Sequence, residues 1–142
     1  MKNNKGFSLV ELIIVIAIMA VLIGVLAPQY LKYVEKSRVS SDKQSVASVV
    51  EAVNTVLTDE SVYDGLGTTV SGTVSFGDTG LSGSDIVTTA VKSVVGDFKL
   101  QSKTYKGKTY SVGYRFNGTD STWSVSSVEE VLGHGVAPAG TT

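Results

Sequence analysis

Hydrophobic residues are distributed unevenly along this chain. Apart from Ser8 and Glu11, every residue from Phe7 to Ala27 is apolar or glycine. A helix over these residues would be about 31 Å long at roughly 1.5 Å per residue, close to the hydrocarbon thickness of a bilayer. The pattern therefore predicts a membrane-spanning helix over 7–27 that contains one ionisable side chain, Glu11. An ionisable group inside hydrocarbon costs several kcal/mol and is a functional candidate for that reason.

The helical pattern continues beyond the apolar run, and we expect one helix over residues 7–58. Its second half carries an apolar stripe at about 100° per residue, formed by Val39, Val46, Val50, Val53 and Leu57. Tyr30, Tyr33 and Val34 point to the opposite side. We expect the stripe to pack on the chain's own globular head and the tyrosine side to meet other chains. A kink in the helix, or tyrosines placed at lipid headgroups, would also explain why the two apolar faces point in opposite directions.

The weak point of the predicted helix lies between Gly24 and Pro28. Pro28 lacks the N–H group that would bond the carbonyl of Gly24, and Gly24 itself lowers helix propensity by about 1 kcal/mol relative to alanine. The segment is interpreted either as a hinge that unwinds on assembly or as a passive kink where the helix leaves the membrane.

The rest of the chain, residues 59–142, is predicted to form a small head with a flexible C-terminal tail. Residues 59–84 contain six glycines and read as a linker, in which Thr68 to Phe76 forms an edge strand, a hairpin or a flexible loop. Ile86 to Val95 follow a helical stripe, with Ser84 or Asp85 as the cap and Gly96 after the end. The β-branched content of this stripe leaves a strand as the alternative.

From Phe98 to Val128 the pattern becomes that of β-strands. Phe98 to Ser102 lead to a turn near Lys106-Gly107, and Tyr110, Val112, Tyr114 and Phe116 alternate with polar residues. Asn117-Gly118 is a hairpin signal, after which Trp123 and Val125 continue the sheet. Glu129 to Leu132 add a short turn. The predicted fold class is α+β, with the long N-terminal helix packed on a small antiparallel sheet of three or four strands.

Composition argues against an enzyme. The 142 residues include no cysteine, and the single histidine, His134, lies in a glycine-rich tail. No catalytic set, cofactor site or metal site is expected. Asp59, Glu60 and Asp64 cluster after the long helix, but their spacing matches no calcium-binding loop, so we read them as a solvated acidic end.

One basic patch remains as a candidate binding surface. Between Asp97 and Asp120 the chain has no acidic residue, and Tyr105, Tyr110 and Tyr114 alternate with basic side chains. The basic residues of this patch are Lys99, Lys103, Lys106, Lys108 and Arg115. Charge and ring stacking would suit DNA or another anionic surface. The alternative is a solubilising outer face of the sheet, although the net charge of −1 gives no overall field that favours nucleic acid.

The first residues indicate how the helix enters a membrane. Lys2 and Lys5 precede the apolar run closely, which favours an N-terminus in the cytoplasm. The run is longer than the apolar core of a secretory signal peptide, and no small-residue cleavage site precedes Pro28.

The segment Gly6-Phe7-Ser8-Leu9-Val10-Glu11, placed between a short basic leader and an unbroken apolar helix, resembles the N-terminus of type IV pilins. More broadly it is similar to the type IV filament family, which includes pseudopilins. The resemblance implies that a prepilin peptidase removes leader residues 1–6 after Gly6 and that Phe7 is then N-methylated. It also implies a homopolymer built by a pilus assembly platform. Glu11 and Pro28 match the family's acidic residue and its helix proline.

The resemblance supplies a partner for Glu11. A buried carboxylate needs a cation, and its own helix offers none three or four residues away. The α-amine that cleavage would create on Phe7 is able to pair with Glu11 of the same chain or of a neighbour. Pairing with a neighbour would set the register of a helical bundle.

Three functions follow from these features. The first is a subunit of an extracellular type IV pilus that serves adhesion, motility or attachment and that waits in the cytoplasmic membrane, N-terminus inside, before assembly. The second is a pseudopilin of a secretion or DNA-uptake machine. The third is a membrane-anchored binding domain that never polymerises.

Overall fold

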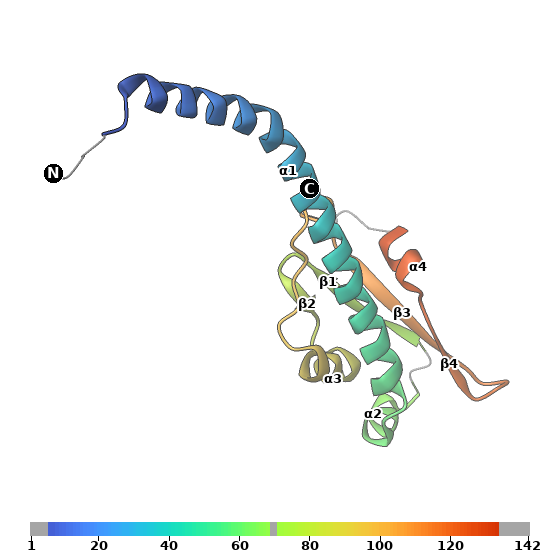
Figure 1. Cartoon of the computed structure of the whole chain (residues 1–142). Helices are drawn as coiled ribbons and strands as arrows, with labels where there is room; N and C mark the ends of the chain where they lie inside the picture. Colours follow the sequence, from blue (N-terminus) through green and yellow to red (C-terminus); the bar gives the residue numbers. More distant parts are fainter. Residues whose placement is uncertain (1–5, 69–70, 134–142) are drawn as a thin grey trace, which may run out of the picture. The chain divides into compact units, whose positions relative to one another are not determined.

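The computed structural model describes residues 6–68 and 71–133 of the chain. The chain divides into two compact units, Met1–Ser37 and Arg38–Thr142, and helix α1 (Leu9–Leu57) belongs to both (Figure 1). The predicted leader, apart from Gly6, and most of the predicted C-terminal tail lie outside the described residues. The second unit is called the head below.

Helix α1 confirms the long helix predicted from the sequence. It continues through Gly24 and includes Pro28 without a break. Single-chain continuity does not test whether this segment unwinds on assembly, so the hinge remains a prediction.

Within the head, one stripe of α1 forms the centre of the hydrophobic core. Val46, Val49 and Val53 have no exposed surface, and Leu57 is almost completely buried. Val39 and Val50 pack against this core from its margin. The stripe predicted from the helical period is therefore confirmed. Tyr30 and Tyr33, on the opposite side of the period, are exposed.

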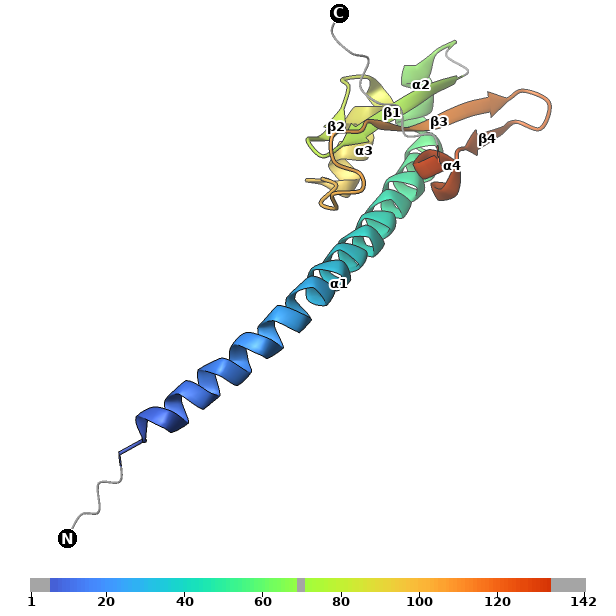
Figure 2. The same ribbon diagram turned by 90° about the horizontal axis from the view of Figure 1, so that it is seen from above.

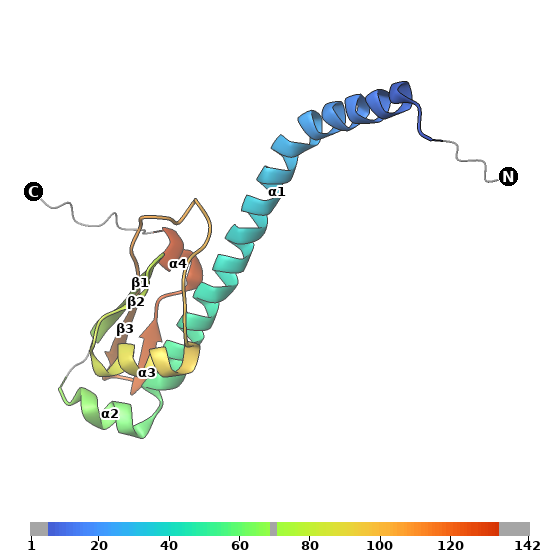
Figure 3. The same ribbon diagram turned by 90° about the vertical axis from the view of Figure 1, so that its left-hand side faces the viewer.

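A four-stranded antiparallel sheet completes the core, and α+β is the fold class observed. Its strands are β1 (Ser71–Gly77), β2 (Gly80–Ser82), β3 (Tyr110–Asn117) and β4 (Thr122–Val125), in the order β2-β1-β3-β4. Alternation along β1 and β3 places Val74, Phe76, Tyr110, Val112 and Tyr114 on the buried face. Figures 2 and 3 show the end of α1 together with α3 (Ile86–Val95) and α4 (Val128–Gly133) on that side of the sheet.

Helix α3 forms where its stripe predicts it, so the alternative of a strand there is wrong. The Asp85 carboxylate accepts the N–H of Thr88 at 3.0 Å, and Gly96 follows the helix with a φ of 72°. Asp85 is thus the cap, in preference to Ser84. A charged cap and a left-handed glycine after the last turn satisfy the free groups at the two helix ends.

Residues 59–84 are not a linker, which corrects the prediction for this segment. They form α2 (Glu60–Leu66), β1 and β2. Asp59 caps α2 by accepting the backbone N–H of Ser61 at 2.9 Å. The Ser61 hydroxyl donates to the same carboxylate oxygen, and this bond, together with the backbone bond, lowers the pKa of Asp59. The acidic cluster therefore marks the start of a helix. Strand β1 is central, paired with both β2 and β3, so the edge-strand alternative is wrong and the hairpin alternative is right.

The segment Phe98 to Ser102 was predicted as a strand and is a loop. The side chains of Phe98 and Leu100 are buried, which explains the β-like pattern. The backbone N–H groups of Gln101 and Ser102, however, bond the carboxylate of Asp42 rather than a neighbouring strand. The predicted turn at Lys106-Gly107 is present, with Gly107 at a φ of 72°. Residues 97–109 are called the lysine loop below.

The hairpin between β3 and β4 forms at the predicted place with a longer turn. Asn117 pairs with Thr122, so four residues close the turn, and the positive φ of 54° falls on Ser121. The Asn117 side chain accepts the N–H of Thr119 at 3.1 Å and donates to Asp120 at 2.9 Å. Asparagine favours the turn here through these side-chain bonds.

Candidate functional site

Glu11 closes the N-terminal end of α1. Its carboxylate oxygen Oε2 accepts the backbone N–H of Ser8 at 3.0 Å, and the Ser8 carbonyl accepts the first helical bond, from Leu12, at 3.2 Å. Ser8-x-x-Glu11 is the spacing of a capping box, and a carboxylate in the first turn also interacts favourably with the helix dipole. The Ser8-x-x-Glu11 spacing is the sequence signal for this cap, in addition to the cationic partner predicted for Glu11.

The apolar segment of α1 is uncovered in the single chain. From Leu9 to Leu26, every large apolar side chain is at least 47 % exposed. Among the residues that the structure describes, α1 is the one helix long and apolar enough to cross a membrane. A contiguous apolar surface of this length requires either lipid or other protein as its surroundings.

The residues at the predicted processing site are open to another protein. Phe7 is 92 % exposed, and no atom lies within 4 Å of the position that a Cβ would occupy on Gly6. A protease would therefore reach the peptide bond between them without displacing any described part of the chain.

A second carboxylate, Asp42, connects α1 to the lysine loop. It is 2 % exposed and accepts the N–H of Ser102 at 2.7 Å and that of Gln101 at 2.9 and 3.1 Å. Sequence analysis did not identify this residue. The signal was its position, because Asp42 lies on the same face of the helix as Val39, Val46 and Val49, where an unpaired carboxylate would be unfavourable.

The basic patch predicted between Lys99 and Arg115 does not form as one surface with exposed aromatic rings. Tyr105, Tyr110 and Tyr114 are at most 7 % exposed, so stacking on bases by these rings is excluded. Burial also raises the pKa of the Tyr110 and Tyr114 hydroxyls. The four lysines, Lys99, Lys103, Lys106 and Lys108, are exposed together on the lysine loop, whereas Arg115 lies on the outer face of β3. Anion binding by the lysines remains a prediction.

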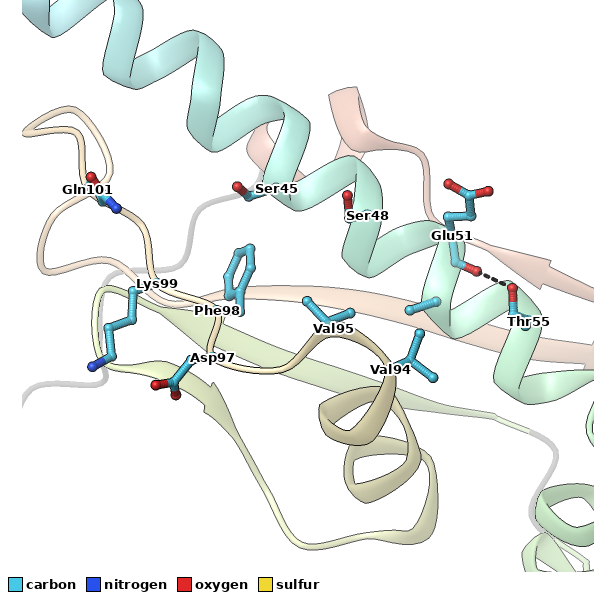
Figure 4. A pocket seen from close by; sticks show the side chains of 11 residues that line it. Ser45, Ser48, Glu51, Thr55, Val94, Val95, Asp97, Phe98, Lys99 and Gln101 are labelled. Atoms are coloured by element: carbon cyan, nitrogen blue, oxygen red, sulfur yellow. Dashed lines mark hydrogen bonds between the residues drawn. The ribbon is translucent and has the colours of Figure 1, made fainter.

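A groove of about 830 Å³ runs between α1 and α3 in the head (Figure 4). Ser45, Ser48 and Thr55 line it from α1, Val94 and Val95 line it from α3, and the start of the lysine loop closes one side. The Thr55 hydroxyl donates to the Glu51 carbonyl at 3.0 Å. The lining mixes hydroxyls with exposed valine, and its charged residues do not converge: Figure 4 shows Glu51 on the opposite side from Asp97 and Lys99. Across the described residues, no three acidic, histidine or cysteine side chains gather in a way that suits a metal ion.

Known proteins resemble the chain in sequence over both of its units. A family model described as "Prokaryotic N-terminal methylation motif" matches residues 1–27. "Fimbrial protein EcpC" of Eikenella corrodens is 31% identical over 131 residues, which cover 87% of this chain and 83% of that protein. "Prepilin peptidase-dependent protein A" of Clostridium perfringens is 30% identical over 132 residues, which cover 87% of this chain and 88% of that protein.

The chain belongs to the type IV pilin family. A shorter match links this pilin to "Type IV major fimbrial protein FimA" of Dichelobacter nodosus, with 39% identity over 56 residues, or 39% of the chain and 36% of FimA. No solved structure matches it significantly. EcpC and FimA are named as fimbrial proteins rather than enzymes, and the apolar α1 agrees with anchoring in a membrane before assembly.

Proposed function

We propose that this pilin is cleaved after Gly6, N-methylated on Phe7 and polymerised through the apolar half of α1 into an extracellular filament. The observation that carries the proposal is the exposed apolar surface from Leu9 to Leu26, which ends at a carboxylate-capped helix terminus. A surface of this kind needs one environment before assembly and another afterwards. Lipid supplies the first, and the same segments of neighbouring subunits supply the second.

Cleavage after Gly6 would change the balance of charge at the helix terminus. It removes Lys2 and Lys5, the two basic side chains that favour retention of the N-terminus in the cytoplasm. It leaves one new amine on Phe7, next to the Ser8 N–H that Glu11 already accepts. The mature helix would then carry an amine and a carboxylate, which makes its transfer out of the membrane less costly than that of the precursor.

Glu11 has room for a second donor in this state. The bond to Ser8 uses Oε2, and the residues that the structure describes place no donor on Oε1. The Phe7 amine of a neighbouring subunit would satisfy this oxygen. A buried pair of unlike charges fixes register because any axial slip leaves both charges unpaired. Glu11 is therefore the proposed register residue of the filament core.

The test compares Glu11→Gln with Glu11→Ala. Glutamine retains an oxygen that accepts the Ser8 N–H but removes the charge, so it separates helix capping from charge pairing. Both variants should insert into the membrane and be processed, and both should give far fewer surface filaments by electron microscopy. Filaments at the wild-type level from either variant would contradict the register role. Wild-type cells with no surface filament, and with the chain only as membrane-bound monomer, would instead favour the non-polymerising anchored domain.

A pseudopilin forms a short filament within the cell envelope, so the same microscopy separates it from a pilin. Two of the relatives are named fimbrial proteins, which supports the pilus over the pseudopilin. Long fibres beyond the cell surface are the expected result.

A further inference from the structure

Charges in the head are separated along its length. From Thr58 to Val91 the sequence has no lysine or arginine, whereas from Lys92 to Arg115 it has six basic residues and a single acidic one, Asp97. The fold separates much of this charge in space as well, because the lysine loop and α2 lie at opposite ends of the head (Figures 1 and 3).

The basic end surrounds the point where α1 enters the head. Asp42 holds the lysine loop there through the N–H groups of Gln101 and Ser102. The basic side chains exposed at this end include Arg38, Lys43, Lys103, Lys106 and Lys108. Two carboxylates lie among them, and both accept backbone N–H groups: Asp42 is buried, and Asp78 binds the N–H of Gly107 at 3.2 Å. A third, Asp97, is exposed where the lysine loop begins. Positive charge therefore dominates the exposed surface.

The acidic end lies where α1 leaves the core. Asp59, Glu60 and Asp64 are exposed on and beside α2, and the start of α3 adds Asp85, since the Ile86 side chain meets Gly65 of α2. An edge-to-face contact between Tyr63 and Phe116, with ring centroids 6.2 Å apart, places the end of β3 next to α2. The turn that follows β3 carries Asp120. Figures 1 and 3 show α2 and the lysine loop at opposite ends of the head.

The two ends are far enough apart to act as separate surfaces. Asp42 and Leu57 are separated by fifteen residues of continuous helix, or about 22 Å at roughly 1.5 Å per residue. This distance exceeds the Debye length of about 8 Å at physiological ionic strength. Attraction between the ends of one head is therefore largely screened, and each end is available to a charged partner.

We propose that the basic end of each head binds the acidic end of another copy of this chain along the filament. The inference rests on the proposed polymerisation, in which all apolar helices point in one direction. Copies that point the same way and are displaced along α1 bring unlike ends together. A head-to-tail contact of this kind produces an open helical filament when each copy is also displaced along the axis, because the chain of contacts then cannot close into a ring. Complementary charge also disfavours the antiparallel arrangement, which would oppose like ends.

The test reverses one charge at each end and then both in the same chain. Lys106→Glu changes the basic end, and Asp64→Lys changes the acidic end without touching the cap residue Asp59. Arg115→Glu is the control: it changes the net charge by the same amount as Lys106→Glu, but it lies near the acidic end, on the outer face of β3, where added negative charge keeps the two ends unlike. Fluorescence of Trp123, the single tryptophan, verifies that each full-length variant is folded. The readout is the fraction of subunit recovered in sheared, pelleted filaments.

Each end variant should lower the pelleted fraction by about threefold to tenfold, because a surface pair of modest strength is lost at every junction. The variant with both reversals should recover most of this loss, since its two ends are again unlike. Arg115→Glu should assemble like the wild type. Wild-type assembly by the single variants, or a double variant that is worse than either, would overturn the charge pairing while leaving the proposed filament function intact. Absence of filaments from the wild type would overturn the filament function itself.

Discussion

The carboxylate of Asp42 and the backbone N–H of Ser102 lie 2.7 Å apart, sixty residues distant in sequence. Asp42 is 2 % exposed, and it also accepts the N–H of Gln101. This pairing fixes the lysine loop to α1. It also explains how a carboxylate is tolerated on the helical stripe that forms the core, because hydrogen bonds replace the water lost on burial.

Substitution of Asp42 should therefore destabilise the head more than the small size of the aspartate side chain suggests. Asp42→Ala leaves two backbone N–H groups without an acceptor and should lower the free energy of unfolding by about 2–3 kcal/mol. Asp42→Asn retains one oxygen and should lose less. Urea unfolding of the detergent-solubilised chain, followed by Trp123 fluorescence, measures both. Asp97→Ala, at an exposed carboxylate in the same loop, is the control and should change stability little; an equal effect from it would refute the role of Asp42.

The Tyr114 ring occupies the space above Gly72, its partner across β1 and β3. A Cβ on Gly72 would overlap the Tyr114 hydroxyl and ring, and Tyr114 is only 6 % exposed, so it has little room to move. Gly72→Val should cost about 1–3 kcal/mol of stability, as overpacked substitutions do. Gly118→Ala introduces a Cβ into open space and should be nearly neutral. Equal melting temperatures for the two variants would show that the ring moves aside freely.

The cap of α2 should make part of the head's stability depend on pH. The Ser61 hydroxyl and backbone N–H lower the pKa of Asp59 below its unfolded value of 3.8. A depressed pKa contributes stability above the unfolded pKa and loses it as the pH falls through the folded one. Unfolding measured between about pH 5 and pH 2 should therefore show a smaller loss for Asp59→Asn than for the wild type. Asp64→Asn retains Asp59 and should follow the wild-type curve; the same flattening in that variant would argue against the cap.

Tyr33 separates contacts between subunits from contacts within the head. Its side chain is 71 % exposed, and it lies in the first unit, outside the core of the head. We expect Tyr33→Ala to reduce the amount of filament severalfold and to leave the unfolding of the head unchanged. Filament yield and urea unfolding are measured on the same variant, with Ser37→Ala as the control. A less stable head with a normal filament yield would contradict this assignment.

The sequence predicted correctly those elements that are specified by residues close together in the chain. The stripe from Val39 to Leu57, the cap and terminal glycine of α3, and the alternation along β3 each specify one structure. The Gly6-Phe7 junction and Glu11 likewise revealed the family, because the spacing of a processing site and a carboxylate within an apolar run is unusual. These features depend on neighbours in sequence.

The errors arose where distant residues decide the structure. Phe98 and Leu100 have the alternation of a strand, but Asp42, far away in sequence, takes the N–H groups that a strand would need. The glycines of residues 59–84 suggested a linker, whereas Gly72 is required under Tyr114 and Gly65 meets Ile86. The basic residues near Tyr110 suggested a binding surface with aromatic rings, but packing of the sheet buries the rings.

The state of the N-terminus tests the central claim most directly. Intact-mass and peptide mass spectrometry of the subunit from sheared surface filaments should show a chain that begins at Phe7 with one added methyl group on its amine. A subunit that retains Met1 to Gly6, recovered only from the membrane fraction, would contradict processing and assembly together.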